Sequence, residues 1–390
     1  MKQAQRRSSL NYRLNITPNL RVGSKNQTFV FHAASGEAEY AFPIIRELKK
    51  QRPDCKIIMT FFSNSYIDVI NTNPEIDEAI PLPLDLPGPT RSFLKQTGPA
   101  AIFISRTDLW PEMITQCQNL KIPVILFSRT QVPIKNIFKK LYYRWLYKKI
   151  DIISVVTNED KKNILNIYPK ANVIIHGDSR WDQVQHKLSL NPKVQYLKPT
   201  LVAGSIWPED FVFLSTAWDK KFGQLILVPH ETDDVFFKNI KSFFSKKGYI
   251  VKFLSEWDFK VNFEKLNVDF DVLIVDKFGV LPRLYYNSYA AFIGGSFKNK
   301  VHSVMEALVC NTPVIVGPYN ENNREAAIFK NIQVEPDSKI MAVNIATTSQ
   351  EIRNLIQDIH KNHLKTKPQF IDIDGNVSKS FLKDITDRQI

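Results

Sequence analysis

Residues 289–318, YAAFIGGSFKNKVHSVMEALVCNTPVIVGP, decide the fold class of this chain. An apolar run at residues 290–293 ends in two glycines, and a helical pattern begins near Val301. A second apolar run, residues 313–316, ends at another glycine. The segment therefore predicts a strand, a glycine turn, a helix that begins near Val301 and a second buried strand.

The glycine turn and the start of the predicted helix contain a candidate nucleotide site. Glycine lets a ligand approach the first backbone amides of a helix, and those amides favour an anion. Ser296 follows Gly295 in the turn, and on the expected helix His302 and Glu306 share a face with Ser303 beside them. Imidazole and hydroxyl groups can bind a phosphate, while a carboxylate one turn deeper can accept both hydroxyls of a ribose. The alternative is an ordinary glycine turn with capping residues.

The composition is that of a globular protein large enough for two domains. The chain has 390 residues, of which 44% are hydrophobic and 23% charged, and this excludes a disordered or fibrous chain. Its three cysteines are far apart, so the sequence predicts neither a disulfide framework nor a zinc site and fits a reducing compartment. With 52 basic and 39 acidic residues the net charge is +13. That balance favours an acidic partner and leaves nucleic acid, anionic lipid and a phosphorylated substrate open.

Short apolar runs alternate with helical patterns along two stretches of the chain. The first series occupies residues 28–33, 55–60, 100–105, 123–128, 152–156 and 173–175, and the second occupies 201–203, 225–228, 249–253, 272–275, 290–293 and 313–316. Buried strands separated by helices are typical of a parallel sheet that is covered on both faces. The sequence therefore predicts an α/β fold of two Rossmann-like, doubly wound domains facing a central cleft.

The expected domain boundaries follow from a break in this pattern. Two prolines and several polar residues interrupt it before the second series begins. We expect an N-terminal domain at residues 1–187, a linker at 188–200 and a C-terminal domain at 201–390, which includes a C-terminal helix at 348–363 and a polar tail. In such sheets ligands bind outside the carboxyl ends of the strands. The residues after each predicted strand are therefore the candidates for a site.

Polar residues follow the predicted strands of the N-terminal domain. The first strand leads into a turn that contains Ser35 and Glu37, and an ionised Glu37 can take a proton from a sugar hydroxyl. The alternative is that Glu37 complements the dipole of the following helix. After a later strand Thr107 or Asp108 is a candidate N-cap, and Arg129 ends the next strand.

The corresponding turns of the C-terminal domain contain candidates for gripping a nucleotide. Gly204 and Ser205 follow the first strand of the second series, His230 follows the second, and Gly279 follows the fourth. These residue types allow close backbone approach and hydrogen bonding to a ligand.

No metal site is predicted. Two Asp-x-Asp pairs occur, at residues 269–271 and 372–374, but neither follows a buried strand, as a diphosphate-binding metal site requires. The seven histidines show no ligand spacing.

Residues 134–149 carry much of the basic charge. Their apolar side chains form one face of a predicted helix, and lysine and arginine occupy the remainder with no acidic residue among them. A basic amphipathic helix with aromatic residues can rest on anionic lipid, or it can pack on its own domain and expose a solvated basic face. The basic start, residues 1–10, precedes no apolar stretch of a signal peptide, and nowhere is there the run of about twenty apolar residues that a membrane span requires. We therefore expect a protein that does not cross a membrane.

Seven turns, taken in order, resemble those of the 3-deoxy-D-manno-octulosonic acid (Kdo) transferases, bacterial enzymes of lipopolysaccharide assembly. The resemblance covers residues 30–327. It rests on HAASGE (32–37), TDLWP (107–111), GDSRWD (177–182), AGSIWPED (203–210), VPHE (228–231), DKFGVL (276–281), and GGSFKNKVHSVMEAL (294–308) with TPVIVGP (312–318). Single turns are weak signals, whereas seven in the same order are a strong one.

This resemblance implies a GT-B type glycosyltransferase that moves Kdo from CMP-Kdo to a lipid A precursor with inversion and with CMP as the leaving group. It implies that Glu37 is the general base and that Ser35, Asp108 and Arg129 lie on the acceptor side. Glu306 would hold the ribose. The remaining donor-side residues would be Gly204, Ser205, His230, Gly279, Gly295, Ser296, His302 and Ser303. No metal or organic cofactor is required.

The same resemblance implies a cytoplasmic protein at the inner face of the bacterial inner membrane, with an anionic lipid acceptor that accounts for the basic charge. Two alternatives stay open. One is a transferase of the same architecture with a UDP donor, and the other is a catalytically silent protein that binds lipid through its basic face. Nucleic acid is not expected as a partner, because the basic residues form no recognisable reader module.

Overall fold

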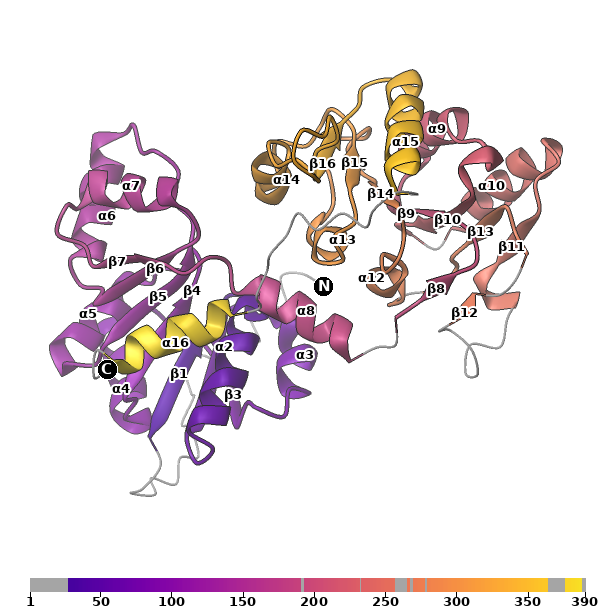
Figure 1. Cartoon of the computed structure of the whole chain (residues 1–390). Coiled ribbons are helices and arrows are strands. Elements are labelled where there is room, and N and C mark those ends of the chain that lie inside the picture. The colour runs from indigo at the N-terminus through magenta and orange to yellow at the C-terminus, as the bar shows by residue number, and fades with distance from the viewer. Residues whose placement is uncertain are drawn as a thin grey trace. The chain divides into compact units, whose positions relative to one another are not determined.

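The computed structural model describes residues 27–190, 193–231, 233–256, 265–266, 269–277, 279–363 and 376–387 (Figure 1). Contacts divide the chain into two units, one of Met1–Gln183 with Asp374–Ile390 and the other of Val184–Ile373. Each unit contains a seven-stranded parallel sheet with helices. The predicted α/β fold of two doubly wound domains is confirmed.

The sheet of the first unit has the strand order β3-β2-β1-β4-β5-β6-β7. Its strands are β1 (Thr28–His32), β2 (Lys56–Phe61), β3 (Glu78–Pro81), β4 (Ala101–Ser105), β5 (Val124–Arg129), β6 (Ile152–Val155) and β7 (Val173–Ile175). Six of them lie where the apolar runs predicted. The edge strand β3 was not predicted, because it is short, only half buried and ends in a proline.

Helices cover both faces of this sheet. They include α2 (Ala38–Gln51), α3 (Ile67–Asn71), α4 (Pro87–Thr97), α5 (Pro111–Leu120), α6 (Ile137–Tyr147) and α7 (Asn158–Ile167), with a short 3-10 turn η1 (Asn64–Tyr66). The division between the two units falls within the next helix, α8 (Arg180–Ser189). Alternate residues of β1 point to opposite faces: Phe29 and Phe31 pack in one hydrophobic cluster with α2, and Val30 packs in the other with α4 and α5. Burial on both faces explains why the strands read as continuous apolar runs.

The helix expected at residues 348–363 is present as α15 (Ser349–His363) in the second unit. The tail after it contains a further helix, α16 (Val377–Asp387), which belongs to the first unit, so the assignment of these residues to the C-terminal domain was wrong. Phe381, Leu382 and Ile385 are buried in the same cluster as Phe31 and the apolar face of α2. In Figure 1 this helix lies along the indigo part of the chain, next to α2. The amphipathic pattern of residues 377–387 forms a helix, but which domain covers its apolar face is decided by packing at long range.

The sheet of the second unit has the order β11-β13-β10-β9-β14-β15-β16. Its strands are β9 (Thr200–Ile206), β10 (Gln224–Pro229), β11 (Val251–Phe253), β13 (Val272–Ile274), β14 (Ala290–Ile293), β15 (Val314–Val316) and β16 (Val343–Ile345). The first six were predicted, and β16 was not. A separate pair of short strands, β8 (Gln195–Tyr196) and β12 (Lys265–Leu266), completes the strands of this unit within the described residues.

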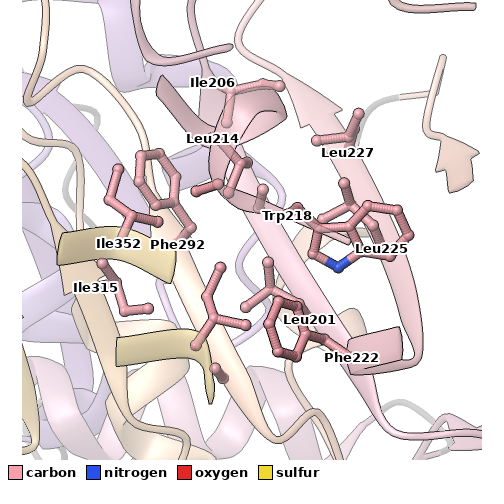
Figure 2. Packing of buried hydrophobic residues seen from close by; sticks show 14 of the residues in the cluster. Leu201, Ile206, Leu214, Trp218, Phe222, Leu225, Leu227, Phe292, Ile315 and Ile352 are labelled. Carbon is pink, nitrogen blue, oxygen red and sulfur yellow. The ribbon is translucent and has the colours of Figure 1, made fainter. Parts of the chain in front are cut away.

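One face of this second sheet is covered by a large hydrophobic cluster, which Figure 2 shows from close by. Leu201, Leu225 and Phe292 from the sheet meet Leu214 of one helix and Ile352 of another. The helices of the unit are α9 (Pro208–Ala217), α10 (Asp234–Lys246), α12 (Leu281–Leu284), α13 (Met305–Val309), α14 (Arg324–Phe329) and α15 (Ser349–His363), with 3-10 turns η2 (Lys220–Phe222) and η3 (Leu254–Glu256). This packing holds the carboxyl ends of β9, β10 and β14 next to one another.

The helix expected near Val301 begins only at Met305, so that prediction was wrong. Residues 295–300 form tight turns instead, and the amide of His302 donates to the carbonyl of Gly294. His302 and Ser303 therefore precede α13, and His302 does not share a helical face with Glu306.

Each sheet has one topological switch point, where the strand order reverses. In the first sheet it lies between β1 and β4, and in the second between β9 and β14. Ligands of doubly wound sheets bind at such points, outside the carboxyl ends of the strands. Both switch points carry residues that the sequence singled out.

Candidate functional site

The N-terminal site consists of Glu37, Arg106, Asp108 and Arg129 at the carboxyl ends of β1, β4 and β5. The strands β1 and β4 pair along their length, which brings the turn after β1 beside the residues after β4. The amide of Ala34 donates to a carboxylate oxygen of Asp108 at 2.8 Å. The structure thus joins these candidates at the switch point.

Glu37 has its carboxylate free within the part of the chain that the structure describes. It is the N-cap residue of α2, yet its side chain makes no capping hydrogen bond, and it is partly exposed. The hydroxyl of Ser105 donates to its backbone carbonyl at 3.0 Å, which fixes the turn. A carboxylate that is held in place by its backbone and has no partner of its own can act as a base.

Asp108 does not cap the helix that follows it, because α5 begins at Pro111 after the N-cap residue Trp110. Asp85 instead accepts hydrogen bonds from the first amides of α5, that of Glu112 at 3.1 Å and that of Met113 at 2.9 Å. Burial raises the pKa of the Asp108 carboxyl above its usual range, and the hydrogen bond from the Ala34 amide offsets only part of this increase. Asp108 therefore binds the turn after β1, which contains Glu37, and not the helix α5 that follows it.

Arg129 is buried and its guanidinium is engaged inside the unit. It donates to the Tyr147 hydroxyl at 2.9 Å, to Gln131 Oε1 at 2.7 Å and to the backbone carbonyl of Arg106 at 3.2 Å. Ser35 lies nearer the surface, and its hydroxyl pairs with that of Ser65 at 2.9 Å. Of the acceptor-side candidates, Arg129 is the one whose side chain has no access to a ligand.

Beneath this site His32 accepts a hydrogen bond at Nε2 from the indole of Trp110 at 2.7 Å, and its Nδ1 lies 2.9 Å from the Thr60 hydroxyl. Burial lowers the pKa of His32 to about 3. The neutral imidazole ties β1 to the segment after β4.

The C-terminal site consists of Trp207, His230, Lys298, His302, Ser303 and Glu306, after β9, β10 and β14. The rings of His230 and His302 stack with centroids 4.2 Å apart, and Trp207 lies 4.7 Å from His230. The Trp207 indole donates to His302 Nε2 at 2.9 Å. Lys298 Nζ lies 3.4 Å from the centre of the Trp207 ring. A partly exposed aromatic stack with a cation beside it suits a planar, anionic ligand.

The protonation state of His302 follows from its surroundings. Burial lowers the pKa of His302 to about 4, and the neighbouring His230 and Lys300 act in the same direction. At neutral pH the imidazole is therefore uncharged and accepts the proton of the Trp207 indole. His302 can offer a ligand its remaining ring nitrogen but no charge.

Ser303 and Glu306 form a second part of this site. The Ser303 hydroxyl donates to Glu306 Oε2 at 2.6 Å, and both residues are partly exposed. This bond orients the carboxylate and leaves its other oxygen free to accept a hydroxyl.

The glycine turn is held from within by a buried carboxylate. Asp210 of α9 accepts hydrogen bonds from the amides of Gly295 at 2.7 Å, Phe297 at 3.1 Å and Trp207 at 2.9 Å. These amides are therefore not available to a phosphate, contrary to the expectation for this turn. Asp210 was missed, because its hydrogen bonds to the glycine turn join residues that are far apart in the sequence.

Two glycines at the switch point are required by close contacts. A side chain at Gly204 would meet the Tyr285 hydroxyl at 2.0 Å, and one at Gly295 would meet the Lys300 carbonyl at 2.3 Å. Gly295 also has a φ of +87°, which favours glycine. These glycines allow the strands and turns to pack and do not by themselves indicate a ligand.

The remaining donor-side candidates differ in their access to solvent. Ser205 is partly exposed and has a left-handed φ of +54°. Gly279 is exposed in the turn after β13. Ser296 is fully buried, and its hydroxyl accepts from the Gly317 amide at 2.7 Å. Ser296 thus shapes the turn from inside, whereas Ser205 and Gly279 lie where a ligand can reach them.

Comparisons with known proteins show which sequences this chain is similar to. Residues 8–183 match the family model described as 3-deoxy-D-manno-octulosonic-acid transferase (kdotransferase). The chain is 28% identical over 312 residues to the 3-deoxy-D-manno-octulosonic acid transferase of Aquifex aeolicus, covering 78% of this chain and 80% of the relative. It is 25% identical over 313 residues to that of Haemophilus influenzae, covering 76% and 72%.

A solved structure with the same fold is the UDP-GlcNAc 2-epimerase from Neisseria meningitidis bound to UDP-GlcNAc. It is 16% identical, covers 93% of this chain and 100% of its own, and superposes with a TM-score of 0.62. At this identity the likeness shows the fold only. The two sequence relatives, in contrast, are both 3-deoxy-D-manno-octulosonic acid transferases, and each aligns with about three quarters of this chain.

Proposed function

Because residues 8–183 belong to the Kdo transferase family and most of the chain aligns with its curated relatives, we propose that this protein transfers Kdo from CMP-Kdo to a lipid A precursor. The reaction is an inverting displacement. The acceptor hydroxyl loses its proton to a base as its oxygen attacks the anomeric carbon, and the bond from that carbon to the phosphate of CMP breaks. CMP leaves with the bonding electron pair.

The observation that carries this proposal is the free carboxylate of Glu37 at the switch point of the first sheet. Within the described residues Glu37 has no hydrogen-bond or ion-pair partner for its side chain, while its backbone is fixed by Ser105. A surface glutamate that only stabilised α2 would be expected to cap it, and Glu37 does not. We assign it the role of general base.

Asp108 supports the base in this scheme. Its carboxylate holds the amide of Ala34, three residues before Glu37, at 2.8 Å. We propose that Asp108 and Ser35 lie on the acceptor side, with Asp108 fixing the turn and Ser35 offering a hydroxyl to the acceptor.

The donor nucleotide is proposed to bind at the C-terminal site. The stacked rings of Trp207, His230 and His302 offer an aromatic surface, and Lys298 beside them offers a positive charge to the phosphate. Glu306, oriented by Ser303, would accept the ribose hydroxyls. Ser205, Gly204, Gly279 and Gly295 shape the backbone around this site.

A lipid acceptor is supported by the surface of α6 and the segment before it. Val132, Ile137, Phe138, Leu141 and Trp145 are exposed by 43 to 79%. They lie among the basic residues Lys135, Lys139, Lys140, Arg144 and Lys148. An exposed apolar surface of this kind with surrounding cations fits the boundary of an anionic bilayer.

The exposure of this surface supports the lipid-contact interpretation of residues 134–149, because only Leu146 and Tyr147 of α6 are buried. Among the residues that the structure describes, no helix combines the length and apolar character that crossing a membrane requires. We propose peripheral binding at the cytoplasmic face of the bacterial inner membrane.

The proposal is tested by offering the purified protein CMP-Kdo and a tetra-acylated lipid A precursor, and measuring the added mass by mass spectrometry. Parallel reactions contain UDP-sugars, and the binding of CMP and UDP is measured by calorimetry. We expect transfer from CMP-Kdo only and tighter binding of CMP than of UDP. Transfer from a UDP-sugar would instead support the alternative donor, and binding without any transfer would support a silent lipid-binding protein.

A further inference from the structure

Arg106, at the end of β4, has a backbone conformation that is unusual for its residue type. Its φ is +53°, in the left-handed region where a residue with a side chain is strained. Both of its backbone polar groups are held: its amide donates to the carbonyl of Phe127 at 2.9 Å, and its carbonyl accepts from Arg129 Nη1 at 3.2 Å. The buried Arg129 is thus a positioning residue for Arg106.

The guanidinium of Arg106 has no carboxylate partner among the described residues. It lies over the ring of Tyr40, with Cζ 4.7 Å from the ring centre, and Nη1 donates to the Tyr40 hydroxyl at 2.5 Å. Its Nε is buried without a hydrogen-bond partner in the described part of the chain. A partly buried cation with only neutral partners is costly unless an anion completes it.

A second positive charge lies behind the first. The partners of Arg129 are the phenol of Tyr147, the amide of Gln131 and a backbone carbonyl, all of them neutral. Among the residues that the structure describes, neither of these two arginines forms an ion pair with a carboxylate, and both lie at the same end of β4 and β5. The charges of both arginines lower the pKa of the nearby Asp108 carboxyl, against the larger effect of burial, which raises it. One oxygen of Asp108 already accepts a hydrogen bond from the Ala34 amide.

The position of Arg106 relates it to the base. β1 and β4 are neighbours in register from Phe29 opposite Ala101 to His32 opposite Ile104, so Glu37 and Arg106 extend from adjacent strand ends. Ser105, directly before Arg106, donates its hydroxyl to the Glu37 carbonyl at 3.0 Å. A ligand whose anionic group binds Arg106 would therefore lie at the same switch point as Glu37.

We propose that Arg106, fixed by Arg129, binds an anionic oxygen group of the substrate whose reaction Glu37 assists. This inference rests on the proposed function. A planar guanidinium matches a phosphate or a carboxylate with two parallel hydrogen bonds. Two sources have this chemistry: a phosphate on the lipid acceptor, and the carboxylate of the sugar acid that is transferred.

The test uses Arg106→Gln and Arg106→Lys in the full chain, with Arg91→Gln on the exposed face of α4 as the matched control. Binding of a phosphorylated lipid acceptor and of the same lipid without its phosphates is measured in detergent micelles, in the absence of donor. The KM for the donor is measured separately. Thermal unfolding checks that each variant is folded. If Arg106→Gln does not fold, the test uses Arg106→Lys instead.

If the acceptor phosphate is the ligand, Arg106→Gln weakens binding of the phosphorylated lipid on the order of tenfold to a hundredfold and leaves the dephosphorylated lipid unchanged. If the sugar carboxylate is the ligand, the KM for the donor rises by a similar factor. Arg106→Lys retains part of either effect, and Arg91→Gln changes neither. Folded variants with both quantities unchanged would overturn the proposal.

The acceptor measurement separates this inference from the proposed function. A natural protein that binds the phosphorylated lipid through Arg106 but transfers no sugar would refute the transferase proposal and retain the anion site. A natural protein that transfers Kdo equally well without Arg106 would refute the site and retain the transferase.

Discussion

At the scale of single residues, two histidines accept hydrogen bonds from tryptophan indoles at the two switch points. Trp110 donates to His32 in the first unit, and Trp207 donates to His302 in the second. Burial lowers the pKa of both imidazoles. A neutral imidazole is needed for this bond, because a protonated Nε2 is a donor and would oppose the indole N–H. The bond therefore makes each switch point sensitive to acid.

We predict that His32 makes the protein less stable as the pH falls below about 6.5. The folded state keeps His32 neutral down to a pKa of about 3, whereas the unfolded chain takes up the proton at about 6.5. Between these values the unfolded state binds more protons, so the free energy of unfolding decreases as the pH falls, by on the order of 2 kcal/mol at pH 5.

Urea unfolding of the natural protein and of His32→Gln at pH 8 and pH 5 measures this effect. The variant is expected to lose less stability on acidification, since glutamine does not titrate. Equal losses in both proteins would show that His32 does not carry this part of the pH dependence.

The sequence singled out many of the residues that lie at the two switch points, but not what their side chains contact. Glu37 and Asp108 could be found because they follow apolar runs, and the strand order then brings them together. The contact between Asp210 and the glycine turn could not, because it joins residues 85 positions apart. The role of Arg129 was likewise hidden, since only the structure shows that its charge is turned inward.

At the scale of secondary-structure elements, α6 buries only Leu146 and Tyr147 in its own unit. Its apolar residues Ile137, Phe138, Leu141 and Trp145 are exposed to solvent. The sequence predicted the amphipathic helix correctly, but its pattern is the same for a helix that packs on a core and for one that lies on lipid. The exposure of the apolar face supports the proposal that α6 lies on lipid.

We predict that Phe138→Ser with Trp145→Ser reduces binding to anionic vesicles by at least about tenfold, because burial of each aromatic side chain contributes roughly 1.5 to 3 kcal/mol. Co-sedimentation with vesicles that contain phosphatidylglycerol measures the bound fraction. Raising the salt concentration is expected to weaken binding of both proteins, since the lysines act by charge.

The matched control is Val235→Ser on α10, which is 66% exposed in the second unit. It should bind vesicles as the natural protein does. Undiminished binding of the double variant would remove α6 from the membrane contact.

At the scale of the whole molecule, the chain forms two α/β units, and its C-terminal helix α16 belongs to the N-terminal unit. The two sheets were predictable because strands buried on both faces have continuous apolar runs. The strands β3 and β16 were not, because they are short and partly exposed at sheet edges. The partner of α16 was not predictable either, because an apolar face does not specify which core it covers.

We predict that Phe381→Ala destabilises the first unit by about 3 to 5 kcal/mol, since it leaves a cavity beside Phe103 and Phe127. Hydrogen exchange measured by mass spectrometry should show faster exchange in β4 and β5 and unchanged exchange in β9 and β14. Ile359→Ala in α15, which lies in the core of the second unit, is the matched control and should show the reverse pattern. Faster exchange in β9 with Phe381→Ala would contradict the assignment of α16.

The claim that the free carboxylate of Glu37 is the base is tested most directly by transfer from CMP-Kdo to the lipid A precursor, with Glu37→Gln compared with the natural protein. Glu47→Gln, on the same helix, is the control for a change of charge. We expect Glu37→Gln to lower turnover by at least about a hundredfold while CMP binding persists, and Glu47→Gln to leave turnover unchanged. Turnover of Glu37→Gln within about twofold of the natural protein would contradict the role of this carboxylate.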